Sequence, residues 1–266
     1  MLLYITWDAS PIITTIGSLE LRWYGLMFAV GFTLGFWMVR RMFLAENAPE
    51  KWLDSLFFLL IAGTLLGARL GHVFFYQWDY YSQHPSEMLQ IWRGGLASHG
   101  GVIGVLLALW LFSRFVSKKS FFWVSDKVAV PIALVGALIR FGNLMNSEIV
   151  GIPTDQPWGF HFVNAARASM ADVPRHPVQL YEALGYLAIF VLLYFLYWRR
   201  KKHQQAGYLT GLWFALIFGT RFVWEFFKSD QGGNIQEALG SFTTGQWLSI
   251  PCVLFGLWLM WRAKEE

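Results

Sequence analysis

The stretch Ile139–Gly151 reads Ile-Arg-Phe-Gly-Asn-Leu-Met-Asn-Ser-Glu-Ile-Val-Gly and closes an apolar segment that begins near Val128. It brings an arginine, two asparagines and a glutamate into nine residues, after a segment with no other charge in its body. Strongly polar groups are costly to place in a bilayer, and those found there usually serve a function. The stretch therefore predicts an apolar helix that ends in a binding site for something polar.

The composition extends this expectation to the whole chain. Of its 266 residues, 56% are hydrophobic and 14% are charged, whereas soluble domains carry about 25% charged residues. The length allows about seven spans of about 20 residues with short connections. We therefore predict an all-α fold, a polytopic membrane protein in which residues 1–266 form a single integral membrane domain.

Seven apolar segments are candidates for these spans. They lie near residues 23–44, 53–76, 96–116, 128–146, 178–198, 209–228 and 244–262. The longest connection, 147–177, holds four prolines and the aromatic run Trp158–Phe162. Because loops of this length are often functional, we expect it to form a periplasmic cap. The first twenty residues lack a basic start and a cleavage site, which favours an exposed N-terminal segment over a removable signal peptide.

The positions of the basic residues predict the orientation. Thirteen of the 21 Lys and Arg residues follow the odd-numbered spans, and five lie on the opposite side. Lys and Arg are enriched on the cytoplasmic side of membrane proteins. The N-terminus is therefore predicted outside and the C-terminus in the cytoplasm. The net charge of +4 reflects this orientation, so no nucleic-acid partner is predicted.

Polar residues in other spans converge on the same side of the membrane. By this topology, five of them fall toward the outer half of the bilayer: His99, Asn143, Asn146, Glu148 and Glu225. Two arginines, Arg140 and Arg221, lie inside spans nearby. An arginine can donate hydrogen bonds to two oxygens at once, which suits binding of a phosphate ester. The sequence thus predicts a site for a phospholipid headgroup.

Structural interpretations of the same residues stay open. Arg221 and Glu225 are four residues apart on one helix face and could neutralise each other. Arg140 and Glu148 could form an ion pair that packs helices. His99, near a helix start, could be a capping or core histidine instead of a base.

Three further residues, His72, His161 and Glu182, are expected in structural or supporting roles. No metal is predicted, because no His/Asp/Glu set has ligand spacing without an arginine beside it. Cys252 is the only cysteine, which excludes an internal disulfide and a cysteine-based cluster. An anion transporter or channel, or a lipid-binding protein without turnover, would be the other classes that fit intramembrane arginines.

The opening stretch resembles the signature of the prolipoprotein diacylglyceryl transferases, which are bacterial inner-membrane enzymes. Their pattern is close to Gly-Arg-x-Gly-Asn-Phe-x-Asn-x-Glu-x-x-Gly. The chain supplies Arg140, Gly142, Asn143, Asn146, Glu148 and Gly151 in register. It departs from the pattern at Ile139 and Leu144, both apolar. Further agreement is spread over Arg22–Gly25, Gly67–Gly71, Ser98–Gly101, Arg175–Glu182, Arg221–Phe222 and Glu225–Phe226.

The resemblance implies a transferase of lipoprotein biosynthesis in the bacterial inner membrane. Such an enzyme would move the diacylglyceryl group of phosphatidylglycerol to the lipobox cysteine of a prolipoprotein, forming a thioether and releasing glycerol 1-phosphate. Its partners would be phosphatidylglycerol, prolipoprotein signal peptides and membrane lipids. No cofactor is implied. Many members carry a tyrosine about one turn before the sixth-span arginine, where this chain has Ile217 and Phe218.

The resemblance also implies roles for individual residues. His99 is the candidate base for the thiol, although an arginine-polarised water could serve instead, and Arg140 and Arg221 would stabilise the departing phosphate. The expected substrate-binding residues are Tyr24, Asn143, Asn146, Glu148, Gly151 and Glu225. Among them, the asparagines would hold headgroup oxygens, the glutamates would orient the arginines, and Tyr24 would supply a hydroxyl at the outer interface.

Overall fold

The structure is a computed structural model that describes residues 4–91, 94–165, 170–229 and 242–263. It divides into two compact units, one made of residues 1–35 and 126–266 and the other of residues 36–125. We call them unit 1 and unit 2 and describe each by itself.

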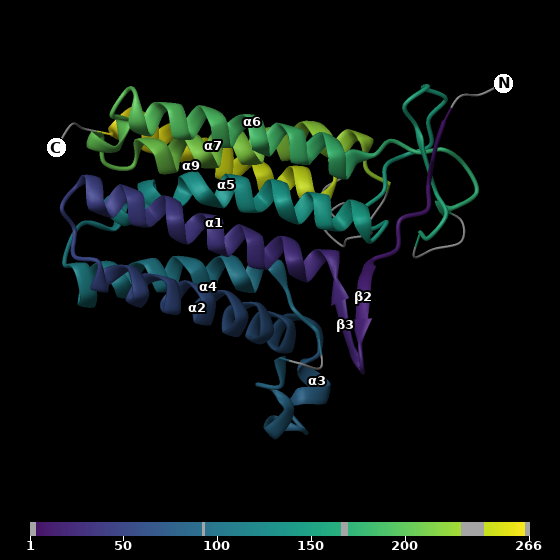
Figure 1. Cartoon of the computed structure of the whole chain (residues 1–266), viewed down its shortest axis with the longest axis horizontal. Helices are drawn as coiled ribbons and strands as arrows, with labels where there is room; N and C mark the ends of the chain where they lie inside the picture. Colours follow the sequence, from purple (N-terminus) through teal and green to yellow (C-terminus); the bar gives the residue numbers. More distant parts are fainter. Residues whose placement is uncertain (1–3, 92–93, 166–169, 230–241, 264–266) are drawn as a thin grey trace. The chain divides into compact units, whose positions relative to one another are not determined.

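A helix occupies each of the seven segments that the sequence predicts (Figure 1). These helices are α1 (Trp23–Ala45), α2 (Lys51–Tyr76), α4 (Ser98–Leu111), α5 (Phe121–Met145), α6 (Val178–Trp198), α7 (Tyr208–Trp224) and α9 (Thr244–Arg262). The bounds predicted for α6 and α9 match residue for residue. Five helical stretches are long and apolar enough to cross a membrane, namely α1, α2, residues 99–117, α5 and α6. The protein is therefore mostly helical and of the multi-pass membrane type.

Unit 1 contains α5, α6, α7 and α9, which run side by side in Figure 1. Helices α7 and α9 approach closely at Gly211 and Gly256, since a Cβ on Gly211 would lie 2.7 Å from the backbone oxygen of Gly256. Small residues of this kind let membrane helices pack backbone to backbone. At the same, N-terminal end of α7, the Asp126 carboxylate accepts hydrogen bonds from the backbone nitrogens of Gly207 (2.8 Å) and Thr210 (2.7 Å). It thereby caps the α7 N-terminus from α5.

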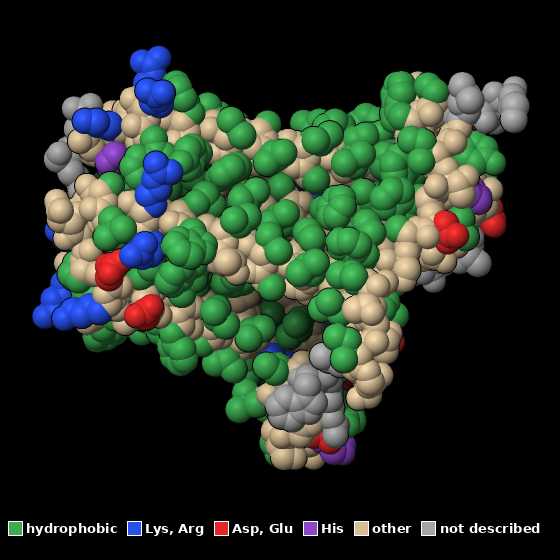
Figure 2. Space-filling model, viewed as in Figure 1, with side chains coloured by type: hydrophobic (Ala, Val, Ile, Leu, Met, Phe, Trp, Pro, Cys, Tyr) green, Lys and Arg blue, Asp and Glu red, His purple; other side chains and the backbone are tan. Residues whose placement is uncertain are grey.

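The surface of α6 is that of a membrane helix. Its exposed large side chains include Leu184, Leu187, Val191, Leu192 and Phe195. In Figure 2 hydrophobic side chains cover the length of the helices of unit 1, and Lys and Arg gather at the end where Arg199–Lys202 follow α6. This distribution agrees with an apolar span that stops at a basic interface.

Unit 2 is built around α2 and α4. Their contact is lined by glycines: a Cβ on Gly71 would lie 2.7 Å from the Cα of Gly100, and one on Gly104 would overlap the backbone oxygen of Gly63. The last turn of α4 continues into a π-helix, Phe112–Ser117. The short helices α3 (Trp78–Tyr81) and η1 (Pro85–Glu87) follow α2.

Four short strands were not predicted, and all belong to unit 1. Strand β1 (Ile5–Trp7) pairs in parallel with β4 (Phe160–Phe162), and β2 (Ile12–Ile16) forms a hairpin with β3 (Leu19–Arg22). Trp7 also donates its indole hydrogen to the backbone oxygen of Leu144 at 3.0 Å. The N-terminal segment is thus fastened to the end of α5, beside the apolar cluster of Leu144, Val150, Phe160 and Phe162.

Candidate active site

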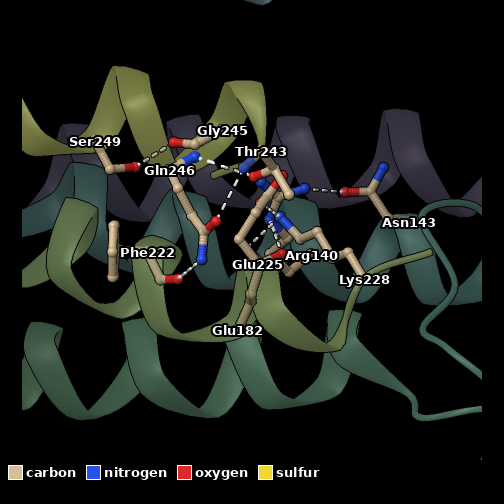
Figure 3. Close-up of polar contacts among 10 residues, drawn as sticks. All are labelled: Arg140, Asn143, Glu182, Phe222, Glu225, Lys228, Thr243, Gly245, Gln246 and Ser249. Atoms are coloured by element: carbon tan, nitrogen blue, oxygen red, sulfur yellow. Dashed lines mark hydrogen bonds and ion pairs between the residues drawn. The ribbon is translucent and has the colours of Figure 1, made fainter. Parts of the chain in front are cut away.

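Arg140 lies in the last two turns of α5 and forms a buried ion pair with α6 (Figure 3). Its Nε is 2.9 Å from Oε2 of Glu182, whose side chain is fully buried. Arg140 itself is 17% exposed. A buried carboxylate needs a close cation to offset its desolvation. Glu182, expected only in a supporting role, is therefore the partner that fixes Arg140.

Lys228 joins two buried carboxylates just beyond the end of α7. Its Nζ lies 3.0 Å from Oε1 of Glu182 and 2.9 Å from Oε2 of Glu225. Glu225 opens the 3-10 turn η6 (Glu225–Phe227), which places it three residues before Lys228. The three side chains therefore connect Arg140 to the end of α7 through alternating charges, as Figure 3 shows.

Glu225 also fits into the first turn of α9. A Cβ on Gly245 would lie 2.5 Å from the carboxylate carbon of Glu225, so only glycine leaves room there. Helix α9 begins with a capping box between Thr243 and Gln246. A negative charge near the N-terminus of a helix is favourable because it faces the unpaired backbone N–H groups. Glu225 thus holds the start of α9 against the charged cluster that it forms with Arg140, Glu182 and Lys228.

A chain of amides extends from Arg140 to the rim of the site. Arg140 donates to Oδ1 of Asn143 at 3.1 Å, and Asn143 donates to Oε2 of Glu148 at 3.1 Å. Asn146 donates to Oε1 of the same carboxylate, also at 3.1 Å. The four polar residues of the stretch 139–151 are thus joined by a continuous chain of hydrogen bonds.

The sequence leaves two ion pairs open as structural alternatives, and the described residues show neither. Glu148 contacts Arg140 through Asn143, where Ser147 and Ile149 adopt left-handed backbone conformations that turn the chain after α5 ends. Helix α7 ends at Trp224, and the 3-10 turn that follows directs Glu225 to Lys228 and not to Arg221.

Arg221 is the second arginine that the sequence places in a phosphate site, and its surroundings are unlike those of Arg140. Within residues 4–91, 94–165, 170–229 and 242–263, no acidic side chain forms an ion pair with it, and its buried Nε has no hydrogen-bond partner. Arg140 and Lys228 are thus paired with the buried carboxylates of Glu182 and Glu225, whereas the Arg221 guanidinium has no such partner among the described residues. A guanidinium in this position suits an anionic ligand such as a phosphodiester.

Tyr24 joins this cluster from the first turn of α1. Its ring packs on α5, where a Cβ on Gly142 would lie 3.0 Å from the ring atom Cδ2. Its hydroxyl interacts electrostatically with both Glu148 and Arg140. The absence of a side chain at Gly142 thus lets Tyr24 approach the two charged residues.

The backbone of Gly151 is held by hydrogen bonds inside the protein. Its backbone nitrogen donates to the oxygen of His176 at 3.0 Å, and its own oxygen accepts from Arg175 at 3.2 Å and from Ser229 at 2.6 Å. Burial lowers the pKa of the neighbouring His176, which favours the neutral imidazole that contacts the Tyr181 hydroxyl. Gly151 thus ties the loop after α5 to the segment after α7.

His99 belongs to unit 2. It is exposed in the first turn of α4, and its ring centroid lies 5.3 Å from that of Phe75 and 5.6 Å from that of Tyr76. The loop that precedes it is held by Arg69, which donates to four backbone oxygens and to a tyrosine hydroxyl. Arg69 is therefore a structural arginine, since its donors are satisfied inside the protein.

The described part of the chain holds no group of three or more His, Cys, Asp or Glu side chains arranged to bind a metal ion. Cys252, the single cysteine, is a free thiol.

Comparison with known proteins gives the site its context. The prolipoprotein diacylglyceryl transferase family matches residues 11–262. A phosphatidylglycerol–prolipoprotein diacylglyceryl transferase of Tolumonas auensis is 47% identical over 260 residues, which cover 98% of each chain. A protein of the same name from Chloroherpeton thalassium is 45% identical over 263 residues, covering 99% of this chain and 96% of the relative. By the extent of these matches, the chain belongs to the prolipoprotein diacylglyceryl transferase family.

Proposed function

We propose that this protein transfers the diacylglyceryl group of phosphatidylglycerol to the thiol of the lipobox cysteine in prolipoproteins. The observation that carries the proposal is the pair of arginines in unit 1: Arg140 is anchored by Glu182, and Arg221 has no ion-pair partner among the described residues. Two arginines in a membrane-embedded cluster suit the phosphate of a phospholipid. The chain's relatives are named phosphatidylglycerol–prolipoprotein diacylglyceryl transferases, which supports this proposal.

The reaction replaces a carbon–oxygen bond by a carbon–sulfur bond. The cysteine thiol loses its proton to a base, and the sulfur attacks the carbon of the diacylglyceryl unit that is bonded to the phosphate oxygen. The electron pair of the broken bond stays on the phosphate oxygen, so glycerol 1-phosphate leaves as the thioether forms. No cofactor takes part in this balance. Negative charge grows on the departing phosphate, where Arg140 and Arg221 would stabilise it.

Most of the remaining roles follow from the contacts in unit 1. Asn143 and Asn146 would hold headgroup oxygens, and the buried Oδ1 of Asn146 has no hydrogen-bond partner in the described parts of the chain. Glu148 would position both asparagines, since it accepts from each of them. Glu225 would act through Lys228, and Tyr24 would offer its hydroxyl at the outer end of α1.

Gly151 is assigned a supporting role. It has both backbone polar groups occupied inside the protein, and we propose that it shapes the loop and does not touch the substrate.

His99 is proposed as the base that takes the thiol proton. An unperturbed cysteine has a pKa of about 8.5, so a base raises the fraction of thiolate at neutral pH. The exposed position of His99 at the start of α4 leaves its ring accessible to a substrate. An arginine-polarised water is the competing base.

The arrangement in the membrane is part of the proposal. Helices α7 and α9 would cross the bilayer together with the five apolar helical stretches, which gives seven spans in one integral domain. The N-terminus would lie in the periplasm and the C-terminus in the cytoplasm of a bacterial inner membrane. The loop 147–177 would then cap the outer ends of the helices. Both substrates are membrane-embedded, so entry would be lateral, between helices.

The test is transfer of labelled diacylglyceryl from phosphatidylglycerol to a lipobox peptide by purified protein in detergent. The parent protein is expected to label the peptide only when its cysteine is present, and His99→Gln should reduce the rate by about 100-fold or more. His84→Gln, an exposed histidine of the same unit, serves as the control and should match the parent. Absence of transfer by folded parent protein would refute the proposed function, and full activity of His99→Gln would assign the base elsewhere.

A further inference from the structure

Tyr186 is a buried tyrosine that the proposed mechanism has not used. It lies on α6 one turn after Glu182, and residues four apart on a helix share a face. Glu182 points to Arg140 on that face. Tyr186 is only 5% exposed, and tyrosines with buried hydroxyls normally hold a hydrogen-bond partner.

Glycines bring Tyr186 to the junction of three helices. On α5, a Cβ on Gly136 would lie 3.2 Å from the Tyr186 ring, and Gly136 is one turn before Arg140. On α6, a Cβ on Gly185 would lie 2.9 Å from Cγ2 of Thr220, the residue before Arg221 on α7. The residues beside Tyr186 thus pack against both arginine-bearing helices.

The hydroxyl of Tyr186 lies within reach of both arginines. It accepts a hydrogen bond from Arg140, and it interacts electrostatically with Arg221 and Glu182. One turn before Arg221, α7 offers only the apolar side chains Ile217 and Phe218. The Tyr186 hydroxyl on α6 is therefore bonded to one guanidinium group and interacts electrostatically with the other.

The hydrogen bond from Arg140 leaves the Tyr186 hydroxyl able to donate its own hydrogen. A phenol donates one hydrogen bond and accepts others, and the bond with Arg140 occupies an acceptor position. A phosphate bound between two guanidinium groups presents further oxygens that accept hydrogen bonds. The phenolic hydrogen and the phosphate are thus complementary.

We propose that Tyr186 is a substrate-binding residue that donates its hydroxyl hydrogen to the phosphate held between Arg140 and Arg221. The inference rests on the proposed function, because it places the phosphodiester of phosphatidylglycerol at these arginines. The same hydroxyl fixes the guanidinium of Arg140 by accepting its hydrogen bond.

Tyr186→Phe tests the inference, because it removes one oxygen and keeps the ring that packs on Gly136. We expect kcat/KM for diacylglyceryl transfer to fall by about 10- to 100-fold, the effect of losing one charge-assisted hydrogen bond. Tyr194→Phe, two turns further along α6, is the matched control and should stay within about twofold of the parent. Activity of Tyr186→Phe equal to that of an active parent would overturn the inference, whereas an inactive parent would refute the proposed function itself.

A binding measurement separates contact with phosphate from a structural role. Titration with dioctanoyl phosphatidylglycerol in detergent should give a Kd for Tyr186→Phe about tenfold or more above that of the parent and of Tyr194→Phe. The double variant Tyr186→Phe/Arg221→Gln should lose less affinity than the product of the two single losses, because both groups contact one phosphate. An unchanged Kd in Tyr186→Phe, even with reduced transfer, would overturn the proposed contact.

Discussion

At the residue scale, Lys228 shows how the cluster distributes its charge. It is 6% exposed and serves two carboxylates that are themselves buried, Glu182 and Glu225. Removing a cation from such a group leaves charge that is neither solvated nor paired, at a cost of about 3–5 kcal/mol. Lys228 is therefore expected to support the position of Arg140 without touching the substrate.

Lys228→Met should accordingly lower the free energy of unfolding by about 3 kcal/mol, and the transfer rate should fall with it. Lys228→Arg keeps the charge and should retain most of the parent's free energy of unfolding and most of its transfer rate. The free energy of unfolding is measured by chemical unfolding in detergent, monitored by tryptophan fluorescence. Lys51→Met, at an exposed position on α2, is the control and should change stability by less than about 0.5 kcal/mol. Equal stability of Lys228→Met and the parent would contradict the charge arrangement.

The sequence predicts the local part of this cluster and misses the distant part. Arg140, Asn143, Asn146 and Glu148 lie within nine residues, so their proximity is evident from the chain itself. The partnership of Arg140 with Glu182 depends on how α5 and α6 pack, and that of Glu225 with Lys228 depends on where α7 gives way to a 3-10 turn. Residue spacing gives no signal for the first pair, whereas the three-residue spacing of Glu225 and Lys228 could have indicated the second.

At the scale of elements, the packing of α2 on α4 depends on glycines. Gly104→Ala should destabilise the protein by about 1–3 kcal/mol, because its Cβ would overlap the backbone oxygen of Gly63 and force the helices apart. An alanine normally stabilises a helix relative to glycine by up to about 1 kcal/mol. Gly219→Ala, at a site with nothing within 4 Å of the new Cβ, should show that ordinary effect. Thermal unfolding compares the two, and a stabilising Gly104→Ala would contradict the close packing.

Helices and strands differ in how well the sequence predicts them. Long apolar runs predicted α1, α2 and α6 to within two residues, since a membrane helix satisfies its own backbone groups. Helix α5 begins seven residues before the predicted start at Val128. Strand β1 pairs with β4, about 155 residues further along the chain, and each has only three residues. Such pairing depends on the loop 147–177 folding against the N-terminal segment, which local patterns do not reveal.

At the scale of the whole molecule, the distribution of charge predicts the orientation in the membrane. In a Cys252→Ala background, a cysteine introduced by Thr14→Cys in the β2–β3 hairpin should react with a membrane-impermeant maleimide added to spheroplasts. One introduced by Lys201→Cys should react only after the membrane is disrupted. Both positions are exposed in the structure. The reverse pattern of labelling would contradict the proposed orientation.

The proposed function requires that the Arg140 guanidinium donates two hydrogen bonds to the substrate phosphate, and Arg140→Lys tests this claim. Lysine keeps the positive charge near Glu182 but lacks the planar fork of donors. We expect Arg140→Lys to reduce the rate of diacylglyceryl transfer to the lipobox peptide by about 100-fold or more. Arg114→Lys, at an exposed site in the π-helix after α4, should match the parent. Substantial transfer by Arg140→Lys would show that a point charge suffices and would contradict the claim.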